Sequence, residues 1–579
     1  MAAEELSEGG MADIIRALQL IHNPTSSNDI RKEASQFVEN LKESDAAARN
    51  GFLLASRMEH EPVVRYFGLT LLDHVLRQYN FTNPEEAKTL RMMILQLAEN
   101  IRPEDPAYFR NKISQLWTEA AKKTWGLNWM DMDANLVQFW GASLVHKELV
   151  LAVLETLSED VFFREDTASS LRGGELNRSL IEIFTPTGIV EEITGDKNIP
   201  TIPRCGQEGW LVRICEFLDN CIQNVSSSEQ ARDAAIKALA TLRSALSWSV
   251  YKGVIASQVV PSIFRALPCQ DDQVLLSAIE ALHALYGRNT IGSEDSHELV
   301  CLIFESEYLG VLQRLYEWSI VGPDDIDEPK YLISKKLSEM VSYIAGCLED
   351  DKFLVSTMDR LNLPPFLQFM ANIMQHQSLT VSIPCLHLWS RLLQNSKISN
   401  LDFVVEHTPQ FLNICTQRLL RWESLPTESD DPTVQFLVED IDTVPERHAF
   451  VGNYRRYCSS IIEIITVKRP QEAVHEILAR VDTNLDNLYS GVQPFSSECY
   501  QPTELWSQRL IHFTVATFSK SSIPLMRADA QFAVVEAVIK GYNKWVSAHG
   551  KAPQRDVGGS SRKMNYRLLI RNRSLNEWN

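Results

Sequence analysis

The chain lacks the cysteine spacing and the long apolar runs that mark secreted and membrane-spanning proteins. Its ten cysteines are scattered singly among 579 residues without a CxxC pair, which is typical of reduced thiols rather than of disulfides or zinc ligands. No stretch reaches the roughly 18 consecutive apolar residues of a membrane-spanning helix. The opening residues, MAAEELSEGG, are acidic and contain neither the basic nor the apolar region of a secretion signal. We therefore expect a soluble intracellular protein that does not insert into a membrane.

The sequence also lacks the motifs of nucleotide binding, metal binding and nucleophilic catalysis. It contains no GxxxxGK[ST], no GxGxxG after a strand, no HExxH and no GxSxG. The 13 histidines are dispersed, and neither His297-Glu298 nor His475-Glu476 has a second metal ligand at a suitable spacing. We therefore predict no catalytic residue, no metal site and no cofactor, and we do not expect an enzyme.

Positive charge is scarce relative to negative charge. The 75 acidic residues outnumber the 56 Lys and Arg, and the net charge of −19 opposes a chain-wide affinity for nucleic-acid phosphate. Such a ligand would need a local basic groove. Residues 322–330 and 424–448 are acidic and punctuated by proline, and we predict that both are long loops between helices. Solvated inserts are the simplest interpretation of these loops, although loops of such length are often functional.

Helical periodicity extends over nearly the whole sequence, whereas strand-type alternation is essentially missing. Over residues 11–21, 30–41 and 271–287 apolar residues recur at every third and fourth position. Helices of about 12 to 20 residues return about every 40 residues, with short polar turns between them. We therefore predict an all-α fold, a superhelical α-solenoid of HEAT-type antiparallel helix pairs with about 12 to 14 repeats. A set of unrelated helical bundles is the alternative.

Prolines and N-cap residues mark several of the predicted helix starts. Pro62, Pro84 and Pro106 are each predicted at the first helical position, where the missing N–H costs nothing. Asn83 and Asp105 precede two of these prolines and are predicted to cap their helices.

The helix predicted from Pro62 to Arg77 has one apolar face and one polar face. The apolar face carries Val64, Phe67, Gly68, Leu71, Leu72 and Val75. We expect Gly68 to lie at a close crossing with a neighbouring helix, which offsets the cost of about 1 kcal/mol that a glycine adds to a helix.

Polar stripes recur in the second helix of three successive pairs. In the chain order of the helices, the stripes are Lys32, Gln36 and Glu39, then Tyr66, Thr70, Asp73 and Arg77, and then Asn111, Gln115, Glu119 and Lys122. Solvated helix faces have the same pattern, so periodicity alone does not make these stripes binding sites.

Three segments within the first 140 residues resemble, in the same order, the N-terminal repeats of the β-karyopherins, the nuclear transport receptors. IHNPTSSNDIRKEASQFVENLK is similar to the proline turn and second helix of the first repeat, and VVRYFGLTLLDHVLR is similar to the inner helix of the second repeat, glycine included. NKISQLWTEAAKKTWGLNWMDM resembles the third-repeat helix that ends in a Trp-Pro…Trp-Pro turn. Here Trp125 and Trp129 are kept, while Gly126 and Met130 stand in place of the prolines. Adaptins and phosphatase scaffolds lack this third segment.

Within the β-karyopherins, RYFGLTLLDHVLR is most similar to the exportin-5 family, and ERHAFVGNYRRY resembles the fungal branch of that group, the Msn5-type exportins. The resemblance implies Ran-binding HEAT repeats over residues 1–145, like the importin-β N-terminal and exportin-1-like regions, and cargo-facing repeats over residues 146–545. Members of this family are considerably longer, so we expect this chain to be an N-terminal half. Residues 546–579 are basic, lack the preceding helical phase and are predicted to be a disordered or non-native tail.

The resemblance implies a nuclear export receptor. Such a receptor binds cargo together with the GTP form of the Ran GTPase, crosses the nuclear pore on FG-repeat nucleoporins, and releases its cargo on GTP hydrolysis. It acts as a monomer and shuttles between nucleus and cytoplasm. The family binds Ran with the inner, concave helices of its first repeats, so the three polar stripes are predicted Ran-binding residues.

The cargo that the resemblance implies is a phosphorylated protein or a small structured RNA. Both are anionic, so both need basic patches on this acidic chain. Arg447, Tyr454, Arg455 and Arg456 combine positive charge with a stacking surface and are the predicted cargo-binding residues. Docking of these residues onto the neighbouring acidic stretch around Asp440 is the alternative.

Two other functions stay open. An importin of the same superfamily would also bind Ran but would lose its cargo when Ran binds. A non-transport HEAT scaffold subunit would ignore Ran and hold a fixed partner enzyme. The residues named above do not by themselves give the direction of transport.

Overall fold

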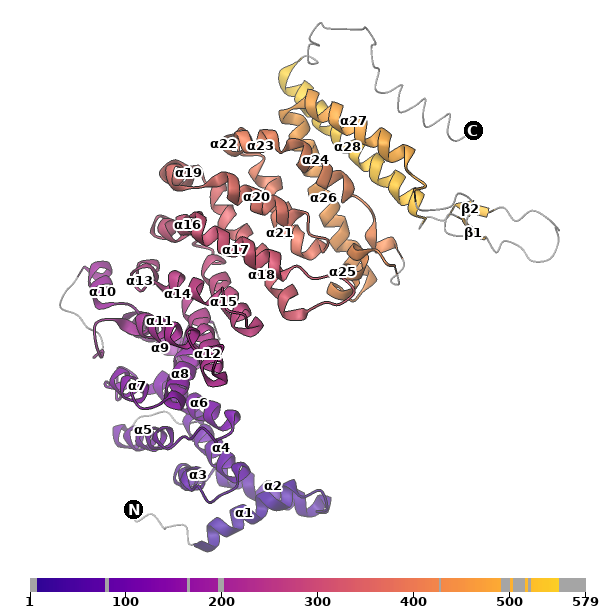
Figure 1. Ribbon diagram of the computed structural model, residues 1–579. Coiled ribbons are helices and arrows are strands. Elements are labelled where there is room, and N and C mark those ends of the chain that lie inside the picture. The colour runs from indigo at the N-terminus through magenta and orange to yellow at the C-terminus, as the bar shows by residue number, and fades with distance from the viewer. Residues whose placement is uncertain are drawn as a thin grey trace, which may run out of the picture. The chain divides into compact units, whose positions relative to one another are not determined.

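The computed structural model describes residues 8–78, 83–163, 167–195, 203–425, 429–490, 500–502, 516–518 and 522–550 (Figure 1). Helices account for almost all regular structure in these residues. The chain forms two compact units. The first comprises Met1–Leu388 with Asp430–Asp440, and the second comprises Trp389–Ser429 with Ile441–Asn579.

Helices follow one another along the first unit with short connections. Its first half contains α1 (Glu8–His22), α2 (Asn28–Lys42), α3 (Ala47–Ser56), α4 (Pro62–Gln78), α5 (Pro84–Glu99), α6 (Ala107–Thr124), α7 (Met132–Trp140), α8 (Leu144–Phe162), α9 (Thr167–Phe184) and α10 (Thr187–Thr194). The chain continues with α11 (Gly209–Ile222), α12 (Glu229–Leu246), α13 (Tyr251–Ala256), α14 (Val259–Ala266), α15 (Asp272–Tyr286), η1 (Glu294–Ser296), α16 (His297–Ile303), α17 (Ser306–Ser319), α18 (Glu328–Gly346), η2 (Cys347–Glu349), α19 (Asp351–Thr357), η3 (Met358–Arg360), α20 (Leu363–Met374) and α21 (Leu379–Leu392).

The division between the units falls inside α21, and α25 (Pro432–Asp440) is part of the first unit. The other elements of the second unit are α22 (Ser396–Ser399), α23 (Asp402–Glu406), α24 (Thr408–Gln417), η4 (Trp422–Ser424), α26 (Val444–Lys468), α27 (Pro470–Asp486), β1 (Tyr500–Pro502), β2 (Ala516–Phe518) and α28 (Ile523–His549). The two short strands pair antiparallel, with Gln501 opposite Thr517.

Two rows of helices run through the first unit. In one row, α4 packs against α6, α6 against α8, α8 against α12, α12 against α15, and α15 against α18. We call this set of helices the second-helix row. The other row supplies a partner to most of them, with α3 beside α4, α5 beside α6, α11 beside α12 and α14 beside α15. Successive pairs that contact their neighbours along the chain confirm the predicted all-α solenoid.

The predicted helix starts are confirmed at two positions. α4 begins at Pro62 and α5 begins at Pro84. The side chain of Asn83 caps α5, because its Oδ1 accepts from the backbone N–H of Glu85 at 3.1 Å. The start of α5 and its cap could be predicted from the sequence, because the capping residue and the proline are adjacent in the chain.

The start of α6 corrects the sequence-based prediction. Pro106 is the N-cap of this helix, so Asp105 lies outside it and does not cap it. Asp105 is instead buried, where its Oδ1 accepts from Arg65 Nη1 of α4 at 2.5 Å and its Oδ2 accepts from the Arg102 N–H at 2.9 Å. An ion pair with the preceding helix pair therefore replaces the expected cap.

The close crossing predicted at Gly68 is confirmed, and its partner is Gly51 of α3. A Cβ at Gly68 would lie 2.5 Å from the Gly51 carbonyl oxygen and 2.7 Å from the Ala55 nitrogen. A Cβ at Gly51 would lie 2.6 Å from the Gly68 carbonyl oxygen. The other predicted packing residues of α4 are buried, except that Val75 is half-buried. Two glycines thus allow the backbones of α3 and α4 to touch.

The first acidic loop is shorter than predicted. Of the stretch 322–330, the part from Glu328 onward is already helical and belongs to α18. Asp327 is its N-cap, and the side chain accepts from the Lys330 backbone N–H at 3.3 Å. The aspartate that suggested a solvated loop therefore begins a helix.

The second acidic stretch is not one loop, which is a further correction. It contains α25, and α26 begins at Val444. Val434, Phe436 and Leu437 of α25 are at most 2% exposed, so a short apolar face inside the acidic stretch is enough to dock a helix. The acidic composition of the stretch predicted a loop and gave no sign of this apolar face.

The predicted boundary at residues 145 and 146 falls within α8, so no break in secondary structure accompanies it. The division into Ran-binding and cargo-facing repeats stays a prediction. Residues 551–579 of the predicted tail lie outside the described residues, while the preceding part of it, to His549, belongs to α28. Searching the described helices for one with the length and hydropathy to cross a membrane finds none.

The crossing predicts that Gly68→Ala destabilises the α3–α4 pair by about 1 to 3 kcal/mol, because the methyl group meets backbone atoms that have no room to move. Gly452→Ala on α26 is the matched control, since nothing lies within 4 Å of its added carbon. The control should stabilise its helix by up to about 1 kcal/mol. Hydrogen exchange of the α3 and α4 amides measures the effect locally in this two-unit chain. Unchanged protection in Gly68→Ala would contradict the close crossing.

Candidate partner-binding surface

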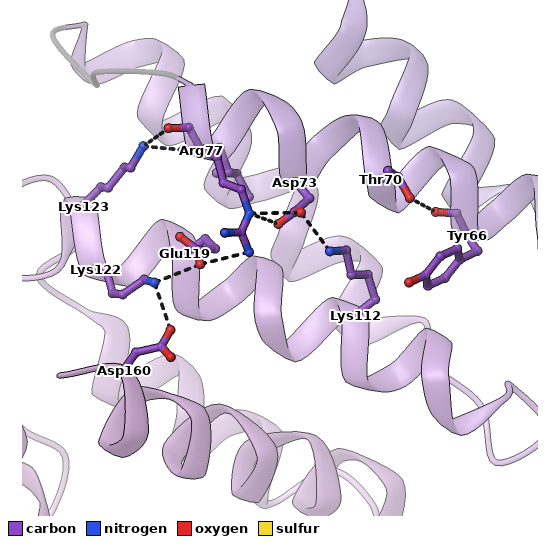
Figure 2. Close-up of polar contacts among 10 residues, drawn as sticks. Tyr66, Thr70, Asp73, Arg77, Lys112, Glu119, Lys122, Lys123 and Asp160 are labelled. Atoms are coloured by element: carbon purple, nitrogen blue, oxygen red, sulfur yellow. Dashed lines mark hydrogen bonds and ion pairs between the residues drawn. The ribbon is translucent and has the colours of Figure 1, made fainter. Parts of the chain in front are cut away.

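Charged side chains of α4, α6 and α8 form a connected network on the second-helix row (Figure 2). Arg77 Nε donates to both carboxylate oxygens of Asp73, each at 3.1 Å, and Arg77 Nη2 lies 3.4 Å from Glu119 Oε1. The same Glu119 oxygen accepts from Lys122 Nζ at 2.9 Å. Lys122 Nζ also donates to Asp160 Oδ2 at 2.9 Å. Alternating charges thus join three successive helices of this row.

The network has an exposed end and a buried end. The Arg77 side chain is 58% exposed, whereas the side chain of Glu119 is 10% exposed and that of Lys122 is 2% exposed. Periodicity places Arg77 in the polar stripe of α4, and Glu119 and Lys122 in that of α6, but only tertiary packing decides which of them meets solvent. A partner can reach Arg77 directly, while Glu119 and Lys122 can influence a partner only through Arg77 or its neighbours.

The remaining residues of the stripes on α2 and α6 face solvent. Lys32, Gln36 and Glu39 are exposed on α2, and Asn111 and Gln115 are exposed on α6. Their exposure keeps these five residues available to a partner, and it is equally typical of a solvated face.

The beginning of the α4 stripe is aromatic and partly apolar. Tyr66 is 37% exposed, and its ring meets the ring of Tyr108 edge-on with 5.3 Å between centroids. Thr70 is half-buried and donates its hydroxyl to the Tyr66 carbonyl oxygen at 3.1 Å (Figure 2). The stripe therefore runs from an exposed tyrosine pair to the exposed guanidinium of Arg77.

Two lysines of α6 that the sequence patterns did not single out also contact α4. Lys112 Nζ lies 2.9 Å from Asp73 Oδ2. Lys123 Nζ donates to the carbonyl oxygens of Leu76 at 2.5 Å and Arg77 at 2.9 Å, at the C-terminal end of α4, where a positive charge is favourable (Figure 2). Lys112 and Lys123 of the neighbouring helix pair thus fix Asp73 and the C-terminal end of α4.

Ion pairs between neighbouring helix pairs recur at a nearly constant separation in sequence. The separations are 40 for Arg65–Asp105, 38 for Arg110–Glu148, 38 for Lys122–Asp160, 39 for Arg232–Asp271 and 37 for Arg243–Glu280. One repeat takes about this many residues, so each cation meets a carboxylate one repeat later. Opposite charges at this separation are the signal that could have identified Asp160 from the sequence.

The carboxyl groups of the half-buried Glu148 and the buried Asp133 show the electrostatic cost of placing charge between helices. Burial raises the pKa of Glu148 above its ordinary value, although Arg110 at 2.9 Å acts to lower it. Burial also raises the pKa of Asp133 on α7, despite hydrogen bonds from the Cys205 N–H at 2.6 Å and from Trp210 Nε1 at 2.7 Å. Glu148 joins α8 to α6, and Asp133 joins α7 to α11 and the residues before it.

The turn after α6 keeps both of its predicted tryptophans in the core. Trp125 and Trp129 are at most 1% exposed, and the Trp129 ring stacks on Trp117 with 5.5 Å between centroids. Gly126 has a φ of 76°, which a glycine adopts readily and a proline cannot. The substitution of the family's proline at this position therefore gives a turn with a different backbone path.

The predicted cargo-binding residues lie on α26 of the second unit. Tyr454 is 1% exposed and Arg447 is 8% exposed, so both are largely covered in this structure. Arg455 Nη2 donates to Asp529 Oδ2 of α28 at 2.8 Å. Arg456 is exposed and is the most accessible of the four. The four residues are therefore together on one helix but do not form one open basic patch.

No cluster of three His, Cys, Asp or Glu side chains in the described residues is arranged to hold a metal ion. Burial raises the pKa of the thiols of Cys215, Cys347 and Cys385, each to about 12, which makes them unreactive at neutral pH.

The network predicts that Lys122→Ala destabilises the α6–α8 contact by about 3 to 5 kcal/mol, because the carboxylates of Glu119 and Asp160 stay buried without their shared cation. Lys42→Ala is the matched control, since Lys42 pairs with Glu39 at 2.7 Å in a far more exposed position. The control should cost less than about 1 kcal/mol. Thermal unfolding and hydrogen exchange of α6 and α8 compare the two variants. Equal effects would contradict the division into a buried and an exposed end.

Comparison with known proteins identifies relatives over most of the chain. Residues 328–556 match the family model described as Exportin-5 family, and residues 106–187 match the one described as Exportin 1-like protein. The chain is 26% identical over 554 residues to Protein MSN5 of Saccharomyces cerevisiae, covering 93% of this chain and 42% of that protein. It is 23% identical over 488 residues to Exportin-5 of Dictyostelium discoideum, covering 83% of this chain and 40% of that protein. The chain therefore spans about two-fifths of the length of these relatives.

Among solved structures, a crystal structure of importin beta matches 93% of this chain and 69% of its own, with 12% identity and a TM-score of 0.34. The sequence matches are more informative, because two family descriptions of exportins and the homology to MSN5 and Exportin-5 agree along the chain. The chain is thus homologous to MSN5 and Exportin-5 over most of its length and is similar to the exportin-5 family over residues 328–556.

Proposed function

We propose that this chain is part of a nuclear export receptor that binds cargo cooperatively with the GTP form of Ran. The observation that carries the proposal is the homology to MSN5 and Exportin-5, which extends over 93% of the chain in the MSN5 comparison. Because the chain spans about two-fifths of these relatives, the proposed transport activity is that of the whole receptor. Such a receptor shuttles between nucleus and cytoplasm, acts as a monomer and passes the pore by contacting FG-repeat nucleoporins.

Ran is proposed to bind the polar stripes of α2, α4 and α6. These stripes combine exposed charged and amide side chains with the exposed aromatic ring of Tyr66. Exposed arginine and tyrosine side chains are the groups that most often dominate binding energy in protein interfaces. Arg77 is the strongest single candidate, because its guanidinium is exposed while Asp73 and Glu119 hold it in place.

Cargo and Ran are proposed to favour each other's binding. By linkage, Ran must increase the affinity for cargo by the same factor by which cargo increases the affinity for Ran. Hydrolysis of GTP then removes the contribution of Ran and releases the cargo. An enzymatic role for this chain is not proposed, since the receptor itself performs binding only.

Phosphorylated proteins or small structured RNAs are the proposed cargo. Both carry phosphate groups that arginine recognises through paired hydrogen bonds. Arg456 is exposed on α26 and lies over the Tyr457 ring at 5.3 Å, so it presents charge and an aromatic surface together. The cargo would not contact the other three predicted residues directly. Arg447 and Tyr454 are buried and Arg455 is paired with Asp529, so they would hold α26 in position.

An importin and a HEAT scaffold are the competing functions. An importin would bind Ran but would show negative coupling between Ran and cargo, whereas a scaffold would not distinguish the two nucleotide forms of Ran. Similarity to the exportin-5 family and to MSN5 favours export.

The test is a titration of the chain with Ran loaded with a non-hydrolysable GTP analogue or with GDP. We expect a preference for the GTP form that Arg77→Ala weakens by about tenfold, equivalent to about 1.4 kcal/mol of binding energy. Arg77→Ala suits this purpose because Asp73 keeps Lys112 and Glu119 keeps Lys122 as partners.

Arg57→Ala is the control, because Arg57 is also exposed but follows α3 instead of lying on the second-helix row. The control should leave the preference for the GTP form unchanged. Equal affinity for both forms of Ran, or equal losses in the two variants, would argue against this proposal and in favour of a scaffold.

A further inference from the structure

Helix α25 belongs to the first unit, although the residues on both sides of it belong to the second. Asp430–Asp440 is part of the first unit, while Trp389–Ser429 and Ile441–Asn579 form the second. The chain therefore leaves one unit, forms a nine-residue helix on the other, and returns. A helix this short is not stable by itself in water, so its structure depends on the surface that it covers.

Apolar contacts hold the middle of α25. Val434, Phe436 and Leu437 are each at most 2% exposed. The Phe436 ring lies 5.2 Å from the ring of Tyr331 on α18 and 5.9 Å from the ring of His376, measured between centroids. An aromatic side chain of α25 thus enters a site made by α18 and the residues before α21.

A single carboxylate anchors the end of the helix. The Asp440 side chain is 3% exposed. It accepts a hydrogen bond from Tyr331 Oη at 2.7 Å, a second from the Thr380 hydroxyl and a third from Lys335 Nζ. Lys335 also lies over the Tyr331 ring at 4.1 Å. Two hydroxyl donors and one ammonium group therefore surround the carboxylate of α25.

The donors are held in position by the first unit itself. Tyr331 Oη also lies 2.7 Å from Ser378 Oγ, and the hydroxyl oxygens of Ser378 and Thr380 lie 2.8 Å apart. The Ser378 N–H donates to His376 Nδ1 at 3.0 Å. These bonds do not involve α25, so the site is organised by residues that remain when α25 is absent.

Charge on the two sides is complementary. The segment that includes α25 carries Asp430, Asp431, Glu439, Asp440 and Asp442. The first turns of α18 carry Lys330, Lys335 and Lys336. Opposite charge of this kind promotes association and selects an acidic partner.

We propose that Tyr331, Lys335, His376, Ser378 and Thr380 form a binding site for an acidic amphipathic helix of a partner protein, which α25 occupies in cis. The matching partner presents an aromatic residue and, four residues later, a carboxylate, as Phe436 and Asp440 do. Because α25 already fills the site, a partner's apparent affinity falls in proportion to the small fraction of molecules in which the site is open. This inference goes beyond the proposed function and does not depend on Ran binding.

The test uses a fluorescent peptide of residues 429–443 and measures its anisotropy with the full chain. Phe436→Asp in the chain weakens α25 docking but leaves the five residues of the site intact. We expect the peptide to bind this variant at least about tenfold more tightly than it binds the unaltered chain, because the competing helix is gone. A peptide carrying Phe436→Ala should bind no better to the variant than to the unaltered chain.

A charge exchange tests the anchor. A peptide with Asp440→Lys should not bind the Phe436→Asp chain, and should regain binding when the chain also carries Lys335→Asp. Binding that is insensitive to Phe436 and Asp440 of the peptide would overturn the proposal, as would the absence of peptide binding to a folded Phe436→Asp chain.

Hydrogen exchange of the unaltered chain decides the case in which Phe436→Asp fails to fold. The proposal expects the amides of α25 to exchange faster than those of α18, because α25 detaches while the rest of the unit stays folded. Exchange of both helices at one common rate would show that α25 is a fixed part of the core and would overturn the proposal.

Discussion

The contact between one helix pair and the next is the constraint on which the rest of this structure depends. A single pair of helices cannot bury its apolar face alone, so each pair is stable only against its neighbours. The second-helix row makes that contact continuously from α4 to α18. The crossing at Gly51 and Gly68 lets the backbones of α3 and α4 meet within one pair. Ion pairs 37 to 40 residues apart join several of the pairs to the next, from Arg65–Asp105 to Arg243–Glu280.

The ion pairs between helix pairs require a free energy of desolvation, because their charges are removed from water. A buried ion pair is weak evidence for stability, because removing two charges from water offsets most of their attraction. Removing one partner is nevertheless expensive, since the other charge stays buried. Lys122, with two carboxylates around it, therefore fixes α6 against α8 more than it strengthens the fold. The same network ends at the exposed Arg77, so a partner that binds Arg77 contacts a group already connected to three helices.

Local features of the fold were predictable from the sequence, and long-range features were not. The cap at Asn83, the start at Pro62 and the packing role of Gly68 each depend on a few neighbouring residues. Asp105 looked like a cap because the sequence does not show that Arg65 of the preceding pair reaches it. Periodicity predicted one polar stripe on α6, of which Asn111 and Gln115 are exposed, whereas the burial of Glu119 and Lys122 depends on α8 and Asp160, one repeat later. The acidic stretch around α25 concealed three apolar residues that dock on a unit formed by distant sequence.

A hydrogen-exchange footprint of the chain with and without Ran bound to a GTP analogue tests the proposed partner-binding surface. We expect slower exchange in α2, α4 and α6, extending to α8 through the contacts of Lys122, and no change with Ran bound to GDP. Slower exchange confined to the other row, in α3 and α5, or an identical footprint with both nucleotides would contradict the assignment of the second-helix row as the partner-binding surface.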